Sequence, residues 1–175
     1  MEMTEINELI NGKAKELVDI CKDKKVTVGF AESLTGGMIS ASVVNIPGAS
    51  AVFKGSVVSY TNEIKENVLG VPSGIIREHT EVSEECALAM ACGGAKVLDC
   101  DLVISVTGIA GPTGALPGKP VGTVYMGCCY ESPDTFGVYS SAFRLNFDGD
   151  RDTIRTETVI SALELAIKLV KEGKA

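Results

Sequence analysis

A serine stands where an apolar stretch gives way to glycines, in the run Ala31-Glu32-Ser33-Leu34-Thr35-Gly36-Gly37. The preceding residues 26–30 predict a buried strand, and residues 38–44 predict a helix. A serine at such a turn lies at a helix N-terminus, where unpaired N–H groups and the helix dipole favour negative charge. That position suits either a bound phosphate or the oxyanion that forms when a serine attacks a carbonyl. The alternative is that Ser33 or Thr35 only caps the helix.

A serine nucleophile needs a base, and this chain offers two kinds. The one histidine, His79, lies in a charged, surface-like run, and no spacing supports it as part of a triad. A lysine that is partly desolvated has a lowered pKa and can accept a proton near neutral pH. Lys65 follows an expected strand into a short helix, and Tyr60 ends that strand. Taken alone, these two residues are typical of a solvated lysine and a tyrosine at the edge of a core.

A second glycine-rich segment, Ser105-Val106-Thr107-Gly108-Ile109-Ala110-Gly111-Pro112, follows another expected strand. Ligands of open α/β sheets bind beyond the carboxyl ends of strands, and glycines let the backbone approach a ligand closely. A loop over 108–120 is longer than most connections, which favours function over a simple surface turn. Arg151 and Arg155 lie one turn apart on the expected last helix. They could hold a phosphate or a carboxylate, or they could simply be solvated.

The sequence gives little support for a metal site. No group of His, Cys, Asp and Glu shows a ligand spacing. Asp148-Gly149-Asp150 matches only a fragment of a calcium loop, so we interpret Asp150 as a helix cap. The six cysteines include no Cys-x-x-Cys pair and lie mostly in apolar surroundings, which indicates buried, reduced thiols.

Composition excludes several classes of protein. The 175 residues are 45% hydrophobic and carry a net charge of -7, which is typical of a globular domain with its own core. An acidic chain without a basic cluster is not expected to bind nucleic acid. No apolar run is long enough to span a bilayer, and the acidic N-terminus does not resemble a signal peptide. We therefore expect a cytoplasmic protein that does not bind membranes.

The elements that position these residues alternate between helix and strand. The last two expected strands are joined by a turn at 132–134 and predict an antiparallel hairpin. The alternation predicts one α/β domain over residues 1–175, a three-layer α/β/α sandwich with a mixed, mostly parallel sheet. Helices are expected over 6–21, 38–44, 62–69, 83–97 and from 150, strands over 26–30, 53–60, 101–107, 122–130 and 137–145, and a loop or short helix over 72–79.

Taken together, these segments resemble the C-terminal domain of the CinA competence/damage-inducible proteins, which is also found alone as a nicotinamide-nucleotide amidase. Their order and spacing span nearly the whole chain, and the set is specific although each piece alone would be weak. The matching segments are 31–37, 59–65, Leu69-Gly70-Val71, Val82-Ser83-Glu84, 105–112, Lys119-Pro120-Val121-Gly122-Thr123-Val124 and Phe147-Asp148-Gly149-Asp150-Arg151.

This resemblance implies an amidase that hydrolyses the carboxamide of nicotinamide mononucleotide to nicotinic acid mononucleotide and ammonia, without a metal or organic cofactor. It implies Ser33 as the nucleophile, Lys65 as its base and Tyr60 nearby. Backbone N–H groups near Ser33 or within 107–111 would form the oxyanion hole. The residues expected to bind the substrate and its phosphate are Thr35, Gly36, Gly37, Thr107, Gly108, Ala110, Gly111 and Arg151.

Two positions depart from the family's pattern. Many relatives carry Cys where this chain has Leu34, so the nearest rival nucleophile is missing. The loop after Pro112 often has the sequence Asp-Gly-Gly but is Thr113-Gly114-Ala115 here, so a contact made by that Asp does not carry over. The long CinA proteins also have an N-terminal domain linked to nucleotide pyrophosphatase activity, which we do not transfer to this chain.

Two other functions fit the same residues. The chain could be a non-catalytic module that binds a nucleotide or a partner in competence or the DNA-damage response, or it could be an amidase acting on a different small amide. For the favoured function we expect a homo-oligomer whose ligand is a small pyridine mononucleotide.

Overall fold

A five-stranded sheet runs through the part of the chain that this computed structural model describes, residues 3–134 and 136–173. Strands β2, β1 and β3 pair in parallel, whereas β3 with β4 and β4 with β5 pair antiparallel. Only β4 of these five strands therefore runs in the opposite direction, and the predicted mixed, mostly parallel sheet is confirmed. In spatial order the strands are β2 (Phe53–Val58), β1 (Val28–Glu32), β3 (Leu102–Gly108), β4 (Thr123–Tyr130) and β5 (Tyr139–Asn146).

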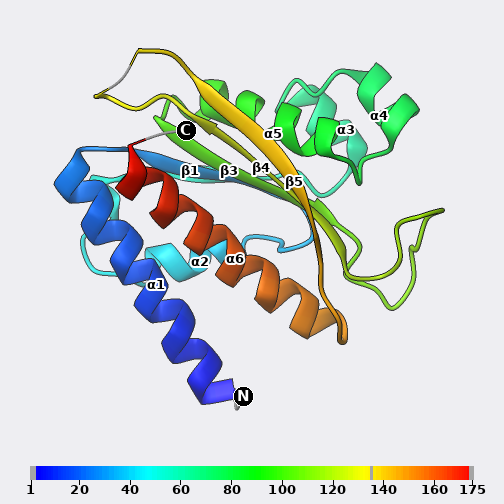
Figure 1. Cartoon of the computed structure of the whole chain (residues 1–175), viewed down its shortest axis with the longest axis horizontal. Coiled ribbons are helices and arrows are strands. Elements are labelled where there is room, and N and C mark those ends of the chain that lie inside the picture. The colour runs from blue at the N-terminus through cyan, green and yellow to red at the C-terminus, as the bar shows by residue number, and fades with distance from the viewer. Residues whose placement is uncertain (1–2, 135, 174–175) are drawn as a thin grey trace.

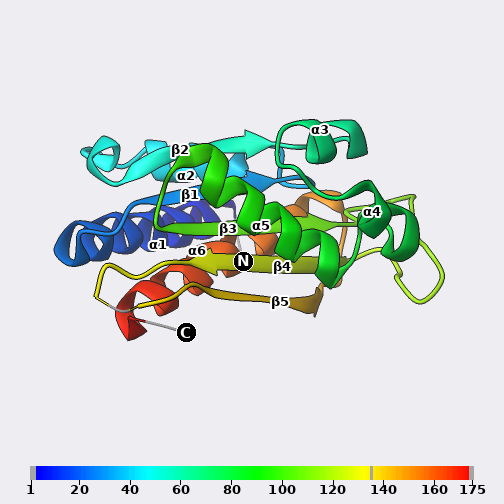
Figure 2. The ribbon, with the colours of Figure 1, turned by 90° about the horizontal axis from the view of Figure 1, so that it is seen from above.

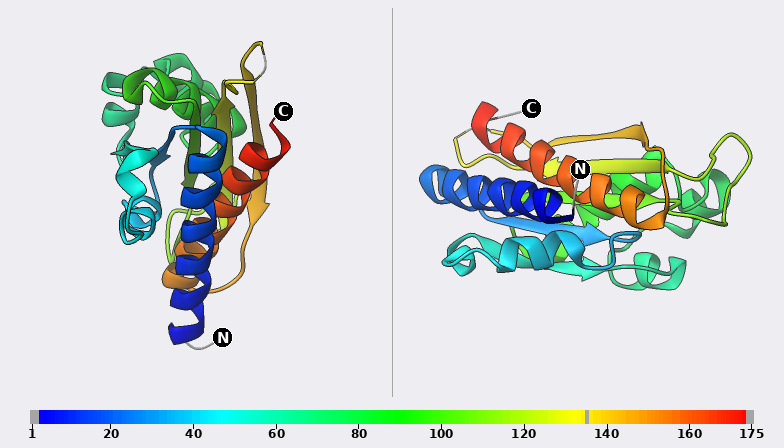
Figure 3. Two further views of the ribbon diagram at one scale, coloured as in Figure 1. Left: turned by 90° about the vertical axis from the view of Figure 1, so that its left-hand side faces the viewer. Right: turned by 90° about the horizontal axis from the view of Figure 1, so that it is seen from below.

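Helices cover both faces of the sheet and complete the three layers that the sequence predicts (Figure 1, Figure 2). On one face lie α1 (Met3–Lys24), α2 (Met38–Val44) and α6 (Arg151–Glu172), with α1 and α6 side by side in both views of Figure 3. On the other face lies α5 (Glu84–Leu98), together with the short helices α3 (Asn62–Asn67) and α4 (Ser73–His79). A 3-10 turn, Ala49–Ala51, leads into β2.

The core follows from the alternation of side chains along the central strands. Phe30 and Ile104 pack into the cluster beneath α1, α2 and α6, whereas Ala31 and Val103 pack into the cluster beneath α5. Both faces of β1 and β3 are covered, so β1 is buried throughout and β3 is buried up to Thr107, and apolar residues dominate both strands.

The strand expected over 26–30 is displaced, and this changes the surroundings of Ser33. β1 begins at Val28 and continues to Glu32, which pairs with Val58 on one side and Val106 on the other. The prediction ended the strand at the last large apolar residue, but the carboxylate of Glu32 is buried with its own hydrogen-bond donors. The other predicted elements are present with small shifts at their ends, and residues 73–79 form helix rather than loop.

None of the helices in the described residues combines the length and the apolar character that crossing a bilayer requires.

Candidate active site

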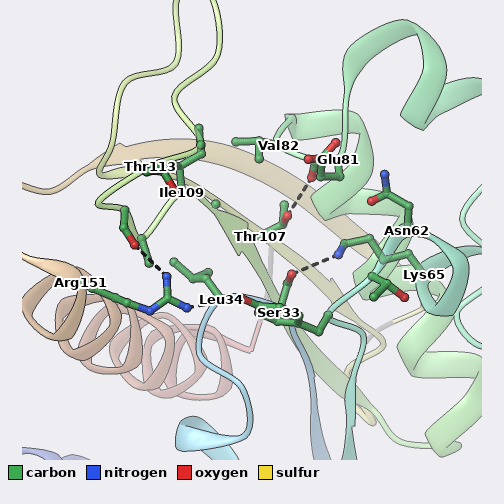
Figure 4. Close-up of a pocket in the computed structure, with 16 residues that line it drawn as sticks. Ser33, Leu34, Asn62, Lys65, Glu81, Val82, Thr107, Ile109, Thr113 and Arg151 are labelled. Atoms are coloured by element: carbon green, nitrogen blue, oxygen red, sulfur yellow. Dashed lines mark hydrogen bonds between the residues drawn. The ribbon is translucent and has the colours of Figure 1, made fainter.

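The ends of two parallel strands bring Ser33 and Lys65 to one edge of the sheet. Glu32 pairs with Val58, and the N–H of Ser59 donates to the carbonyl of Glu32 at 2.8 Å. The chain segments that follow β1 and β2 therefore start side by side. Lys65 Nζ donates a hydrogen bond to Ser33 Oγ at 3.0 Å (Figure 4). The two predicted catalytic residues are thus in direct contact.

The helix α3 directs Lys65 inward although it comes from a polar segment. Its N-cap, Thr61, accepts a hydrogen bond from the N–H of Ile64 at 3.3 Å, which fixes the first turn. Lys65 is 1% exposed, and its Nζ also donates to the carbonyl of Ser59 at 2.7 Å. Of the two alternatives that the sequence left open for Lys65, the solvated surface lysine is therefore wrong.

Burial sets the protonation chemistry of Lys65. Loss of hydration lowers the pKa of the Lys65 ammonium below its ordinary value, because the charged form is the one that burial disfavours. A negative charge on the neighbouring Glu81, or on Cys86 once its thiol ionises, acts in the opposite direction and raises that pKa. Burial raises the pKa of Cys86 to about 11, so its thiol stays protonated near neutral pH.

This geometry allows a proton to pass from the Ser33 hydroxyl to the Lys65 amine. When Lys65 is neutral, one N–H still donates to the carbonyl of Ser59 and the nitrogen lone pair can accept the hydroxyl hydrogen of Ser33. The N–H of Ser33 donates to the carbonyl of Val106 at 3.1 Å, which ties the serine to the end of β3. Ser33 is 7% exposed, and what it exposes faces a cavity.

The cavity beside Ser33 has a volume of about 440 Å³ and opens to solvent. Its walls come from the turn at Ser33 and Leu34, the start of α3, the segment between α4 and α5, and the loop after β3. Arg151 of α6 closes one side (Figure 4). A volume of this order is typical of small-molecule sites.

The loop after β3 is held against the cavity at both ends. Thr107 Oγ1 donates to the carbonyl of Glu81 at 2.7 Å, and Arg151 Nη1 donates to the carbonyl of Gly111 at 2.8 Å. Gly111 has a φ of +77°, and a side chain there would come within 2.5 Å of Val121. The structure therefore brings five of the predicted ligand-binding residues to the cavity wall: Thr107, Gly108, Ala110, Gly111 and Arg151.

Tyr60 also lines the cavity, but at its rim. It is 60% exposed, and its hydroxyl accepts a hydrogen bond from Arg151 Nη2 at 3.3 Å. In the described part of the chain its hydroxyl contacts this arginine rather than Ser33 or Lys65. The position suits orientation of a ligand better than proton transfer at Ser33.

The described residues that line the cavity do not include Thr35, Gly36 and Gly37, for which we expected phosphate contacts. Thr35 Oγ1 donates to Glu32 Oε2 at 2.7 Å, and the N–H of Gly37 donates to the same oxygen at 3.0 Å. The N–H of Gly36 donates to the carbonyl of Ser33 at 3.1 Å. The carboxylate of Glu32 thus occupies the helix N-terminus where we expected a phosphate, and we assign no phosphate contact to these three residues.

Glu32 is the structural residue that sequence reasoning missed. It is fully buried, and its two carboxylate oxygens accept from the N–H groups of Ile39 and Ser40 at 3.1 and 3.0 Å, in addition to Thr35 and Gly37. The hydroxyls of Ser40 and Ser56 donate to it as well. An acid at the end of an otherwise apolar strand, directly before the candidate nucleophile, was the signal that could have revealed it.

Arg155 takes neither of the two roles that the sequence left open, a contact with an anion or a solvated position. Its Nε donates to the carbonyl of Leu34 at 2.9 Å and its Nη2 to the carbonyl of Thr35 at 3.2 Å. It therefore holds the turn after Ser33 and does not join Arg151 at the cavity. The predicted cap of α6 is confirmed, because Asp150 accepts from the N–H of Thr153 at 2.9 Å.

The remaining candidates lie apart from this cavity. His79 ends α4, and its Nδ1 lies 3.5 Å from Glu85 Oε1. The six cysteines are unpaired, and burial raises the pKa of Cys21 to about 12. Across the described residues, no cluster of three or more His, Cys, Asp and Glu side chains is arranged to hold a metal ion.

Fold and site together define a three-layer α/β domain with a buried serine–lysine pair at the carboxyl edge of its parallel strands. The model of the CinA C-terminal domain family matches residues 11–170, and the chain belongs to this family. A CinA-like protein of Thermotoga neapolitana is 46% identical over 156 residues, which are 89% of this chain and 36% of that protein. The chain thus spans about a third of the length of the curated relatives it matches.

Solved structures of the same superfamily share the fold over nearly the whole chain. The competence/damage inducible protein CihA of Agrobacterium tumefaciens is 34% identical with a TM-score of 0.83, over 92% of this chain and 95% of that one. A CinA superfamily protein of Klebsiella pneumoniae is 25% identical with a TM-score of 0.85, over 93% and 98%. The resemblance predicted from the sequence is confirmed at the level of the family.

Proposed function

We propose that this domain is an amidohydrolase that releases ammonia from the carboxamide of nicotinamide mononucleotide, with Ser33 as nucleophile and Lys65 as base. The observation that carries the proposal is the 3.0 Å contact between a buried lysine amine and a serine hydroxyl at the wall of a cavity. A lysine whose pKa is lowered by burial has a neutral fraction that can take the hydroxyl proton.

The reaction has two halves. Neutral Lys65 takes the proton as Ser33 Oγ bonds to the carboxamide carbon, and the resulting ammonium protonates the departing nitrogen, so that ammonia leaves and an ester remains on Ser33. Water then attacks the ester carbon and gives a proton to Lys65, which returns it to Ser33 as the acid is released. One water is consumed, and one amide C–N bond is replaced by a C–O bond.

The oxyanion of each tetrahedral intermediate needs N–H donors that are not already used. In the described part of the chain, the backbone N–H groups of Leu34 and Ala110 donate to no acceptor, and both residues line the cavity. We assign the oxyanion hole to them, because preorganised donors of this kind stabilise the charge that develops on the carbonyl oxygen. The exposed guanidinium of Arg151 is the group that we assign to the nucleotide phosphate.

The test is ammonia release from nicotinamide mononucleotide by the purified protein and by Ser33→Ala. We expect the variant to lose activity by about 10³-fold or more, as for the removal of a nucleophile. Ser50→Ala, which changes an exposed serine, is the matched control and should keep full activity. Unchanged ammonia release in Ser33→Ala would remove Ser33 from the mechanism. Tight nucleotide binding without ammonia from any pyridine amide would favour a binding module instead.

A further inference from the structure

Glu81 is a charged residue of the cavity that the proposed mechanism does not use. Among the described residues that line the cavity, Lys65 and Arg151 bring positive charge and Glu81 is the only acid. Glu81 lies in the connection between α4 and α5 and is partly buried. Its negative charge raises the pKa of both Lys65 and Cys86.

The backbone holds Glu81 firmly at this wall. Its carbonyl accepts the hydrogen bond from Thr107 Oγ1 at 2.7 Å. The preceding Thr80 has a φ of +69°, a conformation that a β-branched residue adopts only where its surroundings impose it. Lys119 Nζ donates to Thr80 Oγ1 at 3.0 Å and to the carbonyl of His79 at 2.9 Å, which anchors that bend.

A carboxylate beside Lys65 hinders base catalysis by that lysine. Glu81 therefore has a different role at this position. The carboxylate of Glu81 raises the pKa of Lys65 and so disfavours the neutral amine that Ser33 requires. A positive charge bound in the cavity would offset this effect. Figure 4 shows Glu81 and Arg151 on different sides of Ser33, so the cavity presents a negative and a positive charge at separate places.

We propose that Glu81 is a specificity-determining residue that selects amides carried on a cationic ring over the same amides on a neutral ring. This inference rests on the proposed function. A pyridine amide that is substituted on its ring nitrogen carries a positive charge beside the carboxamide, and a phosphate adds negative charge at the far end. Glu81 then attracts the ring and Arg151 the phosphate, whereas a free, neutral pyridine amide gains from neither contact.

The experiment compares two ligands that differ in ring charge but share ribose, phosphate and carboxamide: nicotinamide mononucleotide and its 1,4-dihydro form. Binding is measured by calorimetry in a Ser33→Ala background, where no turnover interferes, with and without Glu81→Gln. We expect Glu81→Gln to weaken binding of the cationic nucleotide about tenfold, because a charge pair in a partly screened site is lost. The affinity for the dihydro form should change by no more than about twofold. Glu81→Asp, which keeps the charge, should retain most of the preference.

Glu78→Gln is the matched control, because it removes the same charge from an exposed residue of α4 outside the cavity lining. It should leave both affinities unchanged. Equal losses for the two ligands in Glu81→Gln would overturn the role of Glu81 in selecting charge. That outcome is distinct from failure of the proposed function, which would appear as wild-type protein that releases no ammonia from nicotinamide mononucleotide.

Discussion

Two buried ionisable side chains lie next to Ser33, Glu32 as its neighbour in the chain and Lys65 through a side-chain contact, and they have opposite kinds of partners. Glu32, on the sheet side of the serine, accepts hydrogen bonds from three backbone N–H groups and three hydroxyls. Lys65, on the other side, donates to one carbonyl and to Ser33 itself. In the described part of the chain Lys65 takes part in no ion pair.

The difference indicates which buried charge maintains the fold and which one performs chemistry. Hydrogen bonds from a full set of donors offset the cost of burying a carboxylate. A buried amine without an acid partner is destabilised in its charged form and becomes a base. The turn around Glu32 therefore holds Ser33 in a fixed position, and Lys65 acts as the base that activates it.

Lys65→Met should produce the largest loss of activity, and it separates the chemical role of Lys65 from the structural role of Glu32. We expect ammonia release to fall by about 10³-fold, since the base is gone while the shape of the side chain is roughly kept. The lowered pKa of Lys65 means that the unfolded chain binds more protons than the folded one at pH values between that pKa and 10.5. Wild-type protein should therefore gain stability relative to the variant as the pH rises through this range.

Urea unfolding at several pH values, together with an ammonia assay, measures both parts of this prediction. Lys168→Met, at an exposed position of α6, is the control and should change neither quantity. A variant that keeps its activity would show that Ser33 uses a different base. A stability difference that does not vary with pH would show that the amine is not desolvated in solution.

Glu32→Gln should destabilise the turn around Glu32 rather than change the base, Lys65. The carboxamide keeps the shape of the side chain, but its NH₂ group replaces an acceptor and faces N–H or O–H donors in either orientation. We expect a loss of about 2–4 kcal/mol in the free energy of unfolding, the usual order for leaving buried donors unsatisfied beside a former charge. Denaturant unfolding measures this loss.

The matched control for Glu32→Gln is Glu164→Gln, which removes an exposed carboxylate that pairs with Lys13 at 2.7 Å. This surface pair should contribute less than about 1 kcal/mol. If the two variants lost equal stability, Glu32 would not have the structural role assigned to it.

Much of the fold could be predicted from the sequence, for a clear physical reason. Strands covered on both faces are dominated by apolar residues, as in 102–106, and the turn expected at 132–134 predicts the antiparallel pairing of β4 with β5. The contact between Ser33 and Lys65 could not be derived in this way. These residues are 32 positions apart, and their meeting depends on the register of β1 with β2, which neither segment specifies alone.

The candidate site was predicted in part, and its errors share one cause. Spacing identified the helix N-terminus after Ser33 as a place for an anion, but it could not show that Glu32 folds back to fill that place. Arg151 and Arg155 lie one turn apart, yet one faces the cavity and the other binds the carbonyls of the turn. The position of Glu81 depends on a left-handed backbone at Thr80, which side-chain pattern does not predict.

Arg155→Lys tests whether the turn after Ser33 aligns the serine for catalysis. The guanidinium donates to the carbonyls of Leu34 and Thr35 at once, and a lysine amine cannot reproduce this paired geometry. We expect kcat to fall about fivefold with little change in KM, because Ser33 loses its alignment while the cavity keeps its ligand contacts. Arg77→Lys, an exposed residue of α4, is the control. A rise in KM with kcat unchanged would place Arg155 in substrate binding instead.

The smallest expected effect concerns the pH dependence of the reaction. The rate should rise with pH as Lys65 loses its proton, with a midpoint below the ordinary lysine value of 10.5, because burial lowers the pKa. Glu81 opposes burial and is the weakest of the three influences on Lys65, so Glu81→Gln should move the midpoint slightly to lower pH. A profile of kcat/KM against pH for both proteins measures this shift. A midpoint that moved upward in Glu81→Gln would mean that the carboxylate does not act on the Lys65 amine through its charge, and the electrostatic link between the cavity wall and the base would have to be abandoned.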